Sequence, residues 1–202
     1  MLRTSFELIS GLKPRYRAPK NRLLALEKQN KLFKIVRGLY ETEKNALPFS
    51  LAAAIYGPSY ISFETALAFW GWIPEKVVAV MSATFGKNRT KHFTTDFGLF
   101  LYRDIPQSAF PYEVYIKSEG QRNYLIAGKE KSLCDILYRE SPLGSEKNLK
   151  EYLFDNLRID EADFNSADLV VLNKLCQMYN STNLKLLQAF VNKKTIGGVK
   201  RV

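Results

Sequence analysis

Histidine, cysteine and long apolar runs are scarce in this chain of 202 residues. The one histidine, His92, has no evident orienting partner, and the sequence has no Gly-x-Ser-x-Gly elbow, which disfavours a His-based catalytic triad. The two cysteines, Cys134 and Cys176, lack CxxC spacing, which favours two reduced core thiols over a zinc site or a disulfide framework. No apolar run approaches the roughly 20 residues of a membrane span.

Signals for secretion and for nucleotide chemistry are missing too. The first residues include Glu7 and no long apolar stretch, so we expect no secretory signal and a cytoplasmic location. No Gly-x-x-x-x-Gly-Lys-Ser/Thr phosphate loop occurs. Asp96, Glu113 and Lys117 loosely match the acid, acid and lysine of a metal-dependent nuclease, a spacing that often arises by chance. We therefore expect no enzyme, no cofactor, no metal and no membrane partner, with the nuclease as an alternative.

The positive charge of the chain is concentrated near its N-terminus. Lysine and arginine number 30 against 20 aspartates and glutamates, a formal net charge of +10. Residues 1–40 hold ten of the bases and two of the acids, so a fifth of the chain carries +8. This asymmetry is typical of a module that meets a polyanion. Because the bases alternate with a regular apolar pattern, a merely solvated basic tail is the weaker interpretation.

Apolar spacing in residues 1–46 predicts two helices followed by a hairpin. A first helix is expected at 5–12, and Pro19 suits the first turn of a second helix, where its missing N–H costs nothing. The stretch 32–40 is rich in apolar and β-branched residues and has Gly38 near its end, which predicts two strands joined by a tight turn. Helix, helix and basic hairpin is the order of a winged helix, whose second helix enters the major groove of DNA.

We expect the DNA surface to consist of the basic and polar side chains of this segment. Amide groups at a helix N-terminus favour phosphate, and basic residues on a wing can grip the DNA backbone. Asn21 and Arg22 have the side-chain types that make bidentate contacts to adenine and guanine. The full set of candidates is Lys13, Arg15, Tyr16, Arg17, Lys20, Asn21, Arg22, Lys34 and Arg37.

The remainder, residues 47–202, is expected to be a mixed α/β domain, and the whole chain to belong to the α/β (α+β) class. A connector is predicted at 41–48, and a fragment that starts near Asn45 is expected to fold by itself. The expected elements are helices at 49–56 and 62–70 with Ser62 as N-cap, strands at 76–84, from 92, at 97–103 and 113–116, a helix within 126–138, and three helices in a tail from about 141 to 202.

A basic turn at 86–91 joins the strand at 76–84 to a strand that is expected to return beside it. Lys87, Arg89 and Lys91 have no acid among them. This hairpin tip could be a second DNA contact, a contact with a protein partner, or solvated charge, and the sequence does not decide between them.

Several motifs resemble those of AbiEi-type antitoxins, the transcriptional regulators of bacterial type IV toxin–antitoxin systems. The matching stretches are Tyr16-Arg17-Ala18-Pro19-Lys20, Val36-Arg37-Gly38-Leu39-Tyr40, the run from Tyr56 to Leu67, Gly71-Trp72-Ile73-Pro74-Glu75, and the run from Ala127 to Tyr138. The resemblance covers about residues 13–140. It implies a winged helix that represses its own operon, a phage-defence system, by binding inverted repeats in promoter DNA. It also implies that the chain counteracts a nucleotidyltransferase-type (AbiEii-like) toxin.

A third class of function stays open beside the regulator and the nuclease. In a protein-interaction module without specific DNA binding, the basic N-terminal segment would only keep the chain in solution. A titration against DNA separates the three.

Overall fold

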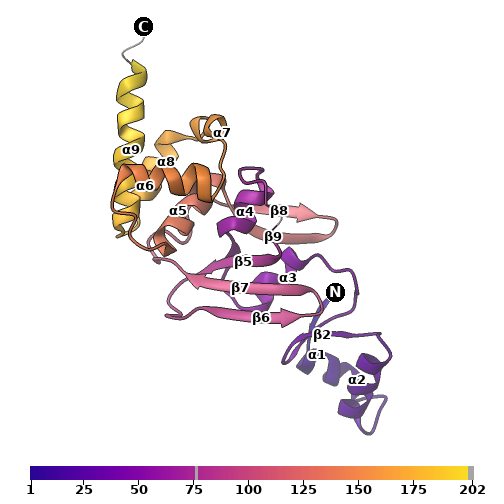
Figure 1. The fold of residues 1–202 in the computed structure, drawn as a ribbon. Helices are drawn as coiled ribbons and strands as arrows, with labels where there is room; N and C mark the ends of the chain where they lie inside the picture. The colour runs from indigo at the N-terminus through magenta and orange to yellow at the C-terminus, as the bar shows by residue number, and fades with distance from the viewer. Residues whose placement is uncertain (76, 200–202) are drawn as a thin grey trace.

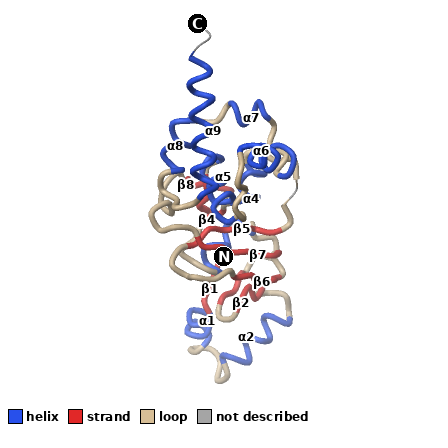
Figure 2. The backbone as a smooth tube through the Cα atoms, turned by 60° about the vertical axis from the view of Figure 1, so that its left-hand side comes forward, coloured by secondary structure: helices blue, strands red, loops and turns tan. Residues whose placement is uncertain are grey.

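The computed structural model describes residues 1–75 and 77–199, and this part of the chain is a mixed α/β protein with two sheets (Figure 1). The predicted α/β class is confirmed. In Figure 1 the N-terminal unit lies at one end of an elongated molecule, the larger sheet lies in the middle, and the C-terminal helices lie at the other end. Figure 2 shows the same order, with strands between two groups of helices.

Five elements make up the N-terminal unit. They are β1 (Leu2–Thr4), α1 (Ser5–Leu12), α2 (Pro19–Lys28), β2 (Phe33–Val36) and β3 (Leu39–Glu41). The sheet order is β1-β3-β2, because β3 pairs antiparallel with β2 through a tight turn and then with β1 on its other side. Both predicted helices and the hairpin are confirmed. The strand β1 was not predicted, since three residues are too few to display an alternating pattern.

Local chemistry explains where these helices begin. Thr4 Oγ1 accepts a hydrogen bond from the amide of Glu7 at 3.2 Å, and the Glu7 carboxylate accepts one from the Thr4 amide at 2.7 Å. This capping box starts α1. Pro19 occupies the first turn of α2, as expected. Between the helices and the sheet lies a small core of Leu23, Leu32 and Tyr40.

The larger sheet has the strand order β6-β7-β5-β4-β9-β8. Its strands are β4 (Tyr60–Ile61), β5 (Ala79–Thr84), β6 (Lys91–Thr95), β7 (Gly98–Asp104), β8 (Val114–Glu119) and β9 (Arg122–Ala127). The pairs β5–β7 and β4–β9 are parallel, and the other pairs are antiparallel. The predicted strand at 76–84 begins at Ala79, and Lys76 lies outside the described residues.

The prediction that the strand after residue 91 returns beside the preceding strand is wrong. β7 lies between β5 and β6, and the tight hairpin is the one that joins β6 to β7. The reason is burial. Phe100 and Tyr102 of β7 are fully buried, so this strand takes a position inside the sheet, whereas half-exposed β6 forms an edge.

Helices cover both faces of this sheet. Their bounds are α3 (Pro48–Ile55), α4 (Phe63–Phe69), α5 (Lys129–Arg139), α6 (Glu146–Glu151), a π-helical segment η1 (Tyr152–Asn156), α7 (Glu161–Asn165), α8 (Leu169–Cys176) and α9 (Thr182–Val199). The predicted three-helix tail is wrong, because several of its helices have only five to eight residues and periodicity cannot resolve them. Within the described residues, no helix combines the length and the apolar character needed to cross a membrane.

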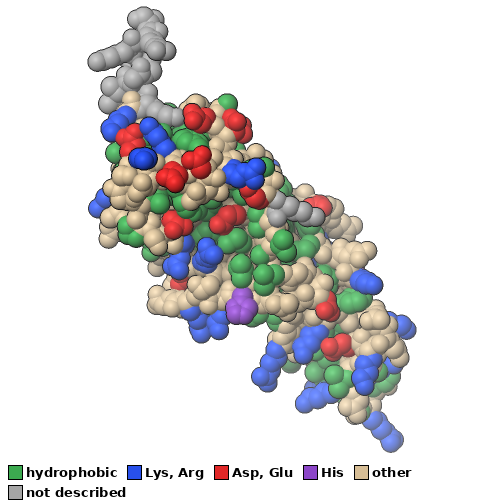
Figure 3. All heavy atoms as spheres, viewed as in Figure 1, with side chains coloured by type: hydrophobic (Ala, Val, Ile, Leu, Met, Phe, Trp, Pro, Cys, Tyr) green, Lys and Arg blue, Asp and Glu red, His purple; other side chains and the backbone are tan. Residues whose placement is uncertain are grey.

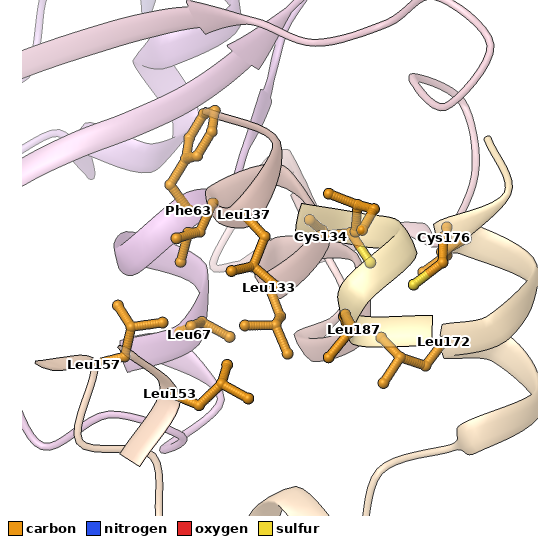
Figure 4. Packing of buried hydrophobic residues seen from close by; sticks show 14 of the residues in the cluster. Phe63, Leu67, Leu133, Cys134, Leu137, Leu153, Leu157, Leu172, Cys176 and Leu187 are labelled. Carbon is orange, nitrogen blue, oxygen red and sulfur yellow. The ribbon is translucent and has the colours of Figure 1, made fainter. Parts of the chain in front are cut away.

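The main core lies between the sheet and the C-terminal helices. Figure 4 shows Leu133 of α5, Leu172 of α8 and Leu187 of α9 converging there, all fully buried. Cys134 and Cys176 belong to the same core as free, buried thiols, as predicted. Burial raises the pKa of the Cys134 thiol well above its usual range, and a hydrogen bond with Cys176 raises it further.

A second core joins the N-terminal unit to the opposite face of the sheet. Ile35 of β2 is 5% exposed and packs in one cluster with Leu51, Phe100 and Tyr102. The ring of Phe33 meets that of Phe97 edge-on at 6.4 Å between centroids. The small sheet therefore lies between its own helices on one face and the larger sheet on the other.

Candidate nucleic-acid interface

The start of α2 and the loop before it point polar and basic side chains into solvent. Leu23 faces the small core, whereas Lys20 and Asn21 are exposed. The first backbone hydrogen bond of the helix runs from the Arg22 amide to the Ala18 carbonyl at 3.1 Å, so the amides of Lys20 and Asn21 precede it. No side chain caps this end in the described structure. Free amides at a helix N-terminus attract an anion.

Arg22 and Tyr16 form one unit. The guanidinium carbon of Arg22 lies 5.2 Å from the centroid of the Tyr16 ring, and Tyr16 is 39% exposed. The Nε atom of Arg22 is buried without a hydrogen-bond partner among the described residues. Stacking on an aromatic ring fixes the guanidinium and lowers the entropy that it loses on binding. The sequence indicated each residue as a contact but gave no sign that they stack.

The hairpin places the two remaining candidates beside the helices. Lys34 lies opposite Tyr40 in the β2–β3 register, hence on the face of the small sheet that packs against α1 and α2. Arg37 is exposed in the turn, where Gly38 has a φ of +85° that favours glycine. Both side chains are exposed.

The charges of this surface are not neutralised within the molecule. Among the described residues, no ion pair includes any of the basic candidates of the N-terminal unit. Figure 3 shows several lysine and arginine side chains around the N-terminal end. The set comprises Lys13, Arg15, Arg17, Lys20, Arg22, Lys34 and Arg37.

The second group of bases, Lys87, Arg89 and Lys91, lies at the connection from β5 to β6. Because β7 separates these two strands, the connection is not the predicted hairpin tip. Arg89 is exposed, and Lys87 and Lys91 are half-buried. The group is at one end of β6, and the N-terminal unit packs near the other end through Phe33 and Phe97.

The residues of the nuclease alternative do not come together. Asp96 follows edge strand β6, whereas Glu113 and Lys117 belong to the opposite edge at β8, a separation of about 24 Å at the usual strand spacing. The Lys117 ammonium lies 4.8 Å from the centroid of a Trp70 ring. Exposed His92 sits on β6. Within the described residues, no group of three or more histidines, cysteines or acids could hold a metal ion.

A buried polar cluster was missed by the sequence analysis. The fully buried carboxylate of Asp135 accepts hydrogen bonds from Tyr60 at 3.0 Å, Ser62 at 2.6 Å and Tyr179 at 2.5 Å, and from Lys131 at 2.8 Å. Burial, followed by the Asp135 charge, raises the pKa of Tyr60 well above its usual range. The prediction that Ser62 caps α4 is therefore half right, since it holds the N-cap position but gives its hydroxyl to Asp135. The i,i+4 spacing of Lys131 and Asp135 was the one available signal.

No family model matches the chain, and no curated protein matches it. The residues and their geometry are what indicate a function for the chain. They form a surface with many basic side chains outside ion pairs, free backbone amides at a helix N-terminus and an arginine stacked on a tyrosine. Such a surface suits a nucleic acid, whose phosphates are anionic and whose base edges form hydrogen bonds.

Proposed function

We propose that this chain is a transcriptional regulator that binds double-stranded promoter DNA through its N-terminal unit, assigned here as a winged helix of residues 1–46. The main support is the element order β1-α1-α2-β2-β3, in which β1 pairs with β3. The lysine and arginine side chains on α2 and on the hairpin, which form no ion pair among the described residues, add to this support. In such modules the second helix lies in the major groove and the hairpin lies beside it.

The dimensions of α2 suit this role. Ten residues give a helix about 15 Å long, and the major groove, about 12 Å wide, admits one α-helix. With the N-terminal half inserted, Asn21 and the Arg22–Tyr16 stack face the base edges, and the free amides and Lys20 face phosphate. Lys34 and Arg37 on the hairpin then contact the neighbouring backbone.

The second half of the proposed function follows from the sequence resemblance. We propose a cytoplasmic antitoxin, not an enzyme, that represses its own operon and counteracts a nucleotidyltransferase-type toxin. Residues 47–202, with the sheet and the C-terminal helices, are assigned to the antitoxin role. Most of their buried side chains belong to a core that is separate from the small core of the N-terminal unit.

Titration of the full chain against its own upstream DNA and against a scrambled duplex tests DNA binding. Lys20→Ala and Arg37→Ala should each lower the slope of log K against log salt by about 0.9, because each removes one phosphate contact. Lys147→Ala, an exposed lysine of α6 at the far end of the molecule, is the matched control and should leave the slope unchanged. Unchanged slopes for both test variants, or equal affinity for the two duplexes, contradict the assignment.

Co-expression tests the antitoxin role. The chain and its neighbouring toxin gene are expressed from independent promoters, so that repression of the operon cannot account for protection. Growth rescued under these conditions supports direct antitoxin action. Failure of a soluble chain to rescue growth contradicts it and leaves the DNA-binding proposal to the titration.

A further inference from the structure

The basic turn of residues 86–91 has a fixed conformation. The Asp104 carboxylate, at the end of β7, accepts hydrogen bonds from the amides of Lys87 at 2.6 Å and Asn88 at 2.5 Å, and from the Thr84 hydroxyl. The Lys87 ammonium lies 5.3 Å from the centroid of the Tyr56 ring. Hydrogen bonds to Asp104 therefore fix the backbone of the turn, and the turn carries its three basic side chains on this fixed backbone.

This turn carries concentrated and unpaired charge. It holds three bases and no acid, and none of the ion pairs in the described structure uses Lys87, Arg89 or Lys91. Asp104, the nearest acid in the frame, has both oxygens occupied by hydrogen bonds from the turn and from Thr84. The bases are thus available to an external anion.

The turn and the N-terminal unit flank the same edge of the larger sheet. β6 has five residues and spans about 15 Å, with the turn at its start and β2 packed near its end. Figure 3 shows lysines and arginines on both sides of an indentation below His92, between this edge and the N-terminal unit. One turn of DNA rises about 34–36 Å, so about 15 Å is close to half a turn.

The segment that contains α6 and α7, toward the opposite end of the molecule, is acidic. Residues 140–168, which include α6 and α7, hold eight acids and three bases. Figure 3 shows acidic side chains in this part of the molecule, with some lysines and arginines among them. The surface of α6 and α7 is therefore a poor partner for a polyanion, in contrast to the N-terminal unit and the start of β6.

We propose that Arg89 and Lys91, with Lys87 beside them, form a second contact with the phosphate backbone of the duplex that α2 engages. The inference rests on the proposed DNA binding and extends it. Bound DNA runs from α2 past the hairpin and along the β6 edge, so the footprint exceeds that of a lone winged helix by about half a turn. Asp104 is a positioning residue for this contact.

Duplex length tests the inference. A duplex of about 12 base pairs, centred on the α2 site, is compared with one extended by about 10 base pairs on each side. The wild-type chain should bind the longer duplex more tightly, with a steeper salt slope. Arg89→Gln with Lys91→Gln should abolish this gain, lowering the slope on the long duplex by about 1.8, and should leave binding to the short duplex unchanged. Arg139→Gln with Lys147→Gln removes the same charge from exposed positions elsewhere and should retain the gain.

The Asp104→Asn variant distinguishes a DNA contact that depends on the ordered turn from nonspecific electrostatic attraction to DNA. This variant raises the net charge by one, so simple electrostatics predicts tighter binding to the long duplex. A contact that depends on an ordered turn predicts a smaller gain instead, and thermal unfolding shows whether the variant is folded. Tighter binding by a folded Asp104→Asn chain would overturn the positioning role.

The outcomes distinguish this inference from the proposed function. If Lys20→Ala weakens binding and the Arg89/Lys91 variant retains the full gain from the long duplex, the second contact is refuted and the winged helix stands. If the Arg89/Lys91 variant binds DNA normally and loses protection against the toxin, the turn is a protein contact and the inference is wrong. If the wild-type chain binds neither duplex, both fail.

Discussion

The guanidinium of Arg122, on β9, donates a hydrogen bond from Nη1 to Oε2 of Glu41, on β3, at 2.9 Å, and the Glu41 side chain is completely buried. Burial alone would raise the pKa of Glu41, but hydrogen bonds from Arg122, the amino terminus and the amides of Glu43 and Thr42 lower it to about 2. The pair links the small sheet to the large one across the segment that the sequence indicated as a connector.

Loss of this link should destabilise the whole chain. Arg122→Gln removes one of the two cations that pair with the buried carboxylate and leaves the amino terminus as the other, and we expect the free energy of unfolding to fall by about 3 kcal/mol. Arg158→Gln is the matched control, because Arg158 and Glu75 form an ion pair of the same 2.9 Å length with both side chains exposed. That variant should lose less than about 1 kcal/mol. Urea unfolding measures both, and equal losses contradict the expectation.

Acid should remove the contribution of Glu41. Its folded pKa is below the unfolded value, so its stabilisation is complete above about pH 4.5 and is lost as the pH falls toward 2. By pH 3 the wild-type chain should lose about 2 kcal/mol relative to Glu41→Gln, whose amide does not titrate. Unfolding curves at pH 7, 5, 4 and 3 measure the difference. A constant difference between the two proteins means that the pKa of Glu41 is not depressed.

Removal of residues 1–44 tests how far the two units are independent. The sequence predicts that a fragment starting near Asn45 folds by itself. The shared core argues for reduced stability, because the truncation uncovers Phe97 and takes Glu41 from Arg122. We expect a poorly soluble fragment that binds a hydrophobic dye, and, in the full chain, a loss of about 2–5 kcal/mol for Ile35→Ala. A soluble fragment with the wild-type melting temperature contradicts this expectation.

The stack of Arg22 on Tyr16 should govern sequence preference. Arg22→Ala should cost about 1–3 kcal/mol on the operator and much less on random DNA. Tyr16→Phe keeps the ring and should behave like the wild type, whereas Tyr16→Ala frees the guanidinium and should approach the Arg22→Ala loss. Anisotropy titrations on the two duplexes measure this. Equal losses on both duplexes would make Arg22 a backbone contact.

Local patterns predicted the N-terminal unit well. Pro19, Gly38 and the apolar spacing between them act within a few residues, and the two helices and the hairpin are where those signals placed them. The same is true of α3, α4 and α5 to within a residue or two at most ends. These elements depend on caps, turns and periodicity that the sequence displays directly.

Pairings between distant segments were not predictable. Nothing near residues 91–95 indicates that β7 would take the inner position, because that choice depends on burial of Phe100 and Tyr102 under α3. β4 has two residues and joins the two halves of the sheet without a local signature. The stack of Arg22 on Tyr16 depends on the loop between the helices, whose conformation no periodicity encodes.

The buried cluster around Asp135 couples the unfolding of the C-terminal helices to that of the sheet. Tyr179 follows α8, Lys131 lies in α5, and Tyr60 belongs to the sheet, yet all three bind one carboxylate. If the C-terminal helices separated from the sheet, Tyr179 would lose its contact with the buried Lys131–Asp135 ion pair. No new contact in a partly opened state would compensate for that loss. Amide protons of α8 should therefore exchange only as fast as those of the central strands. The C-terminal helices and the larger sheet therefore unfold together, as one cooperative unit.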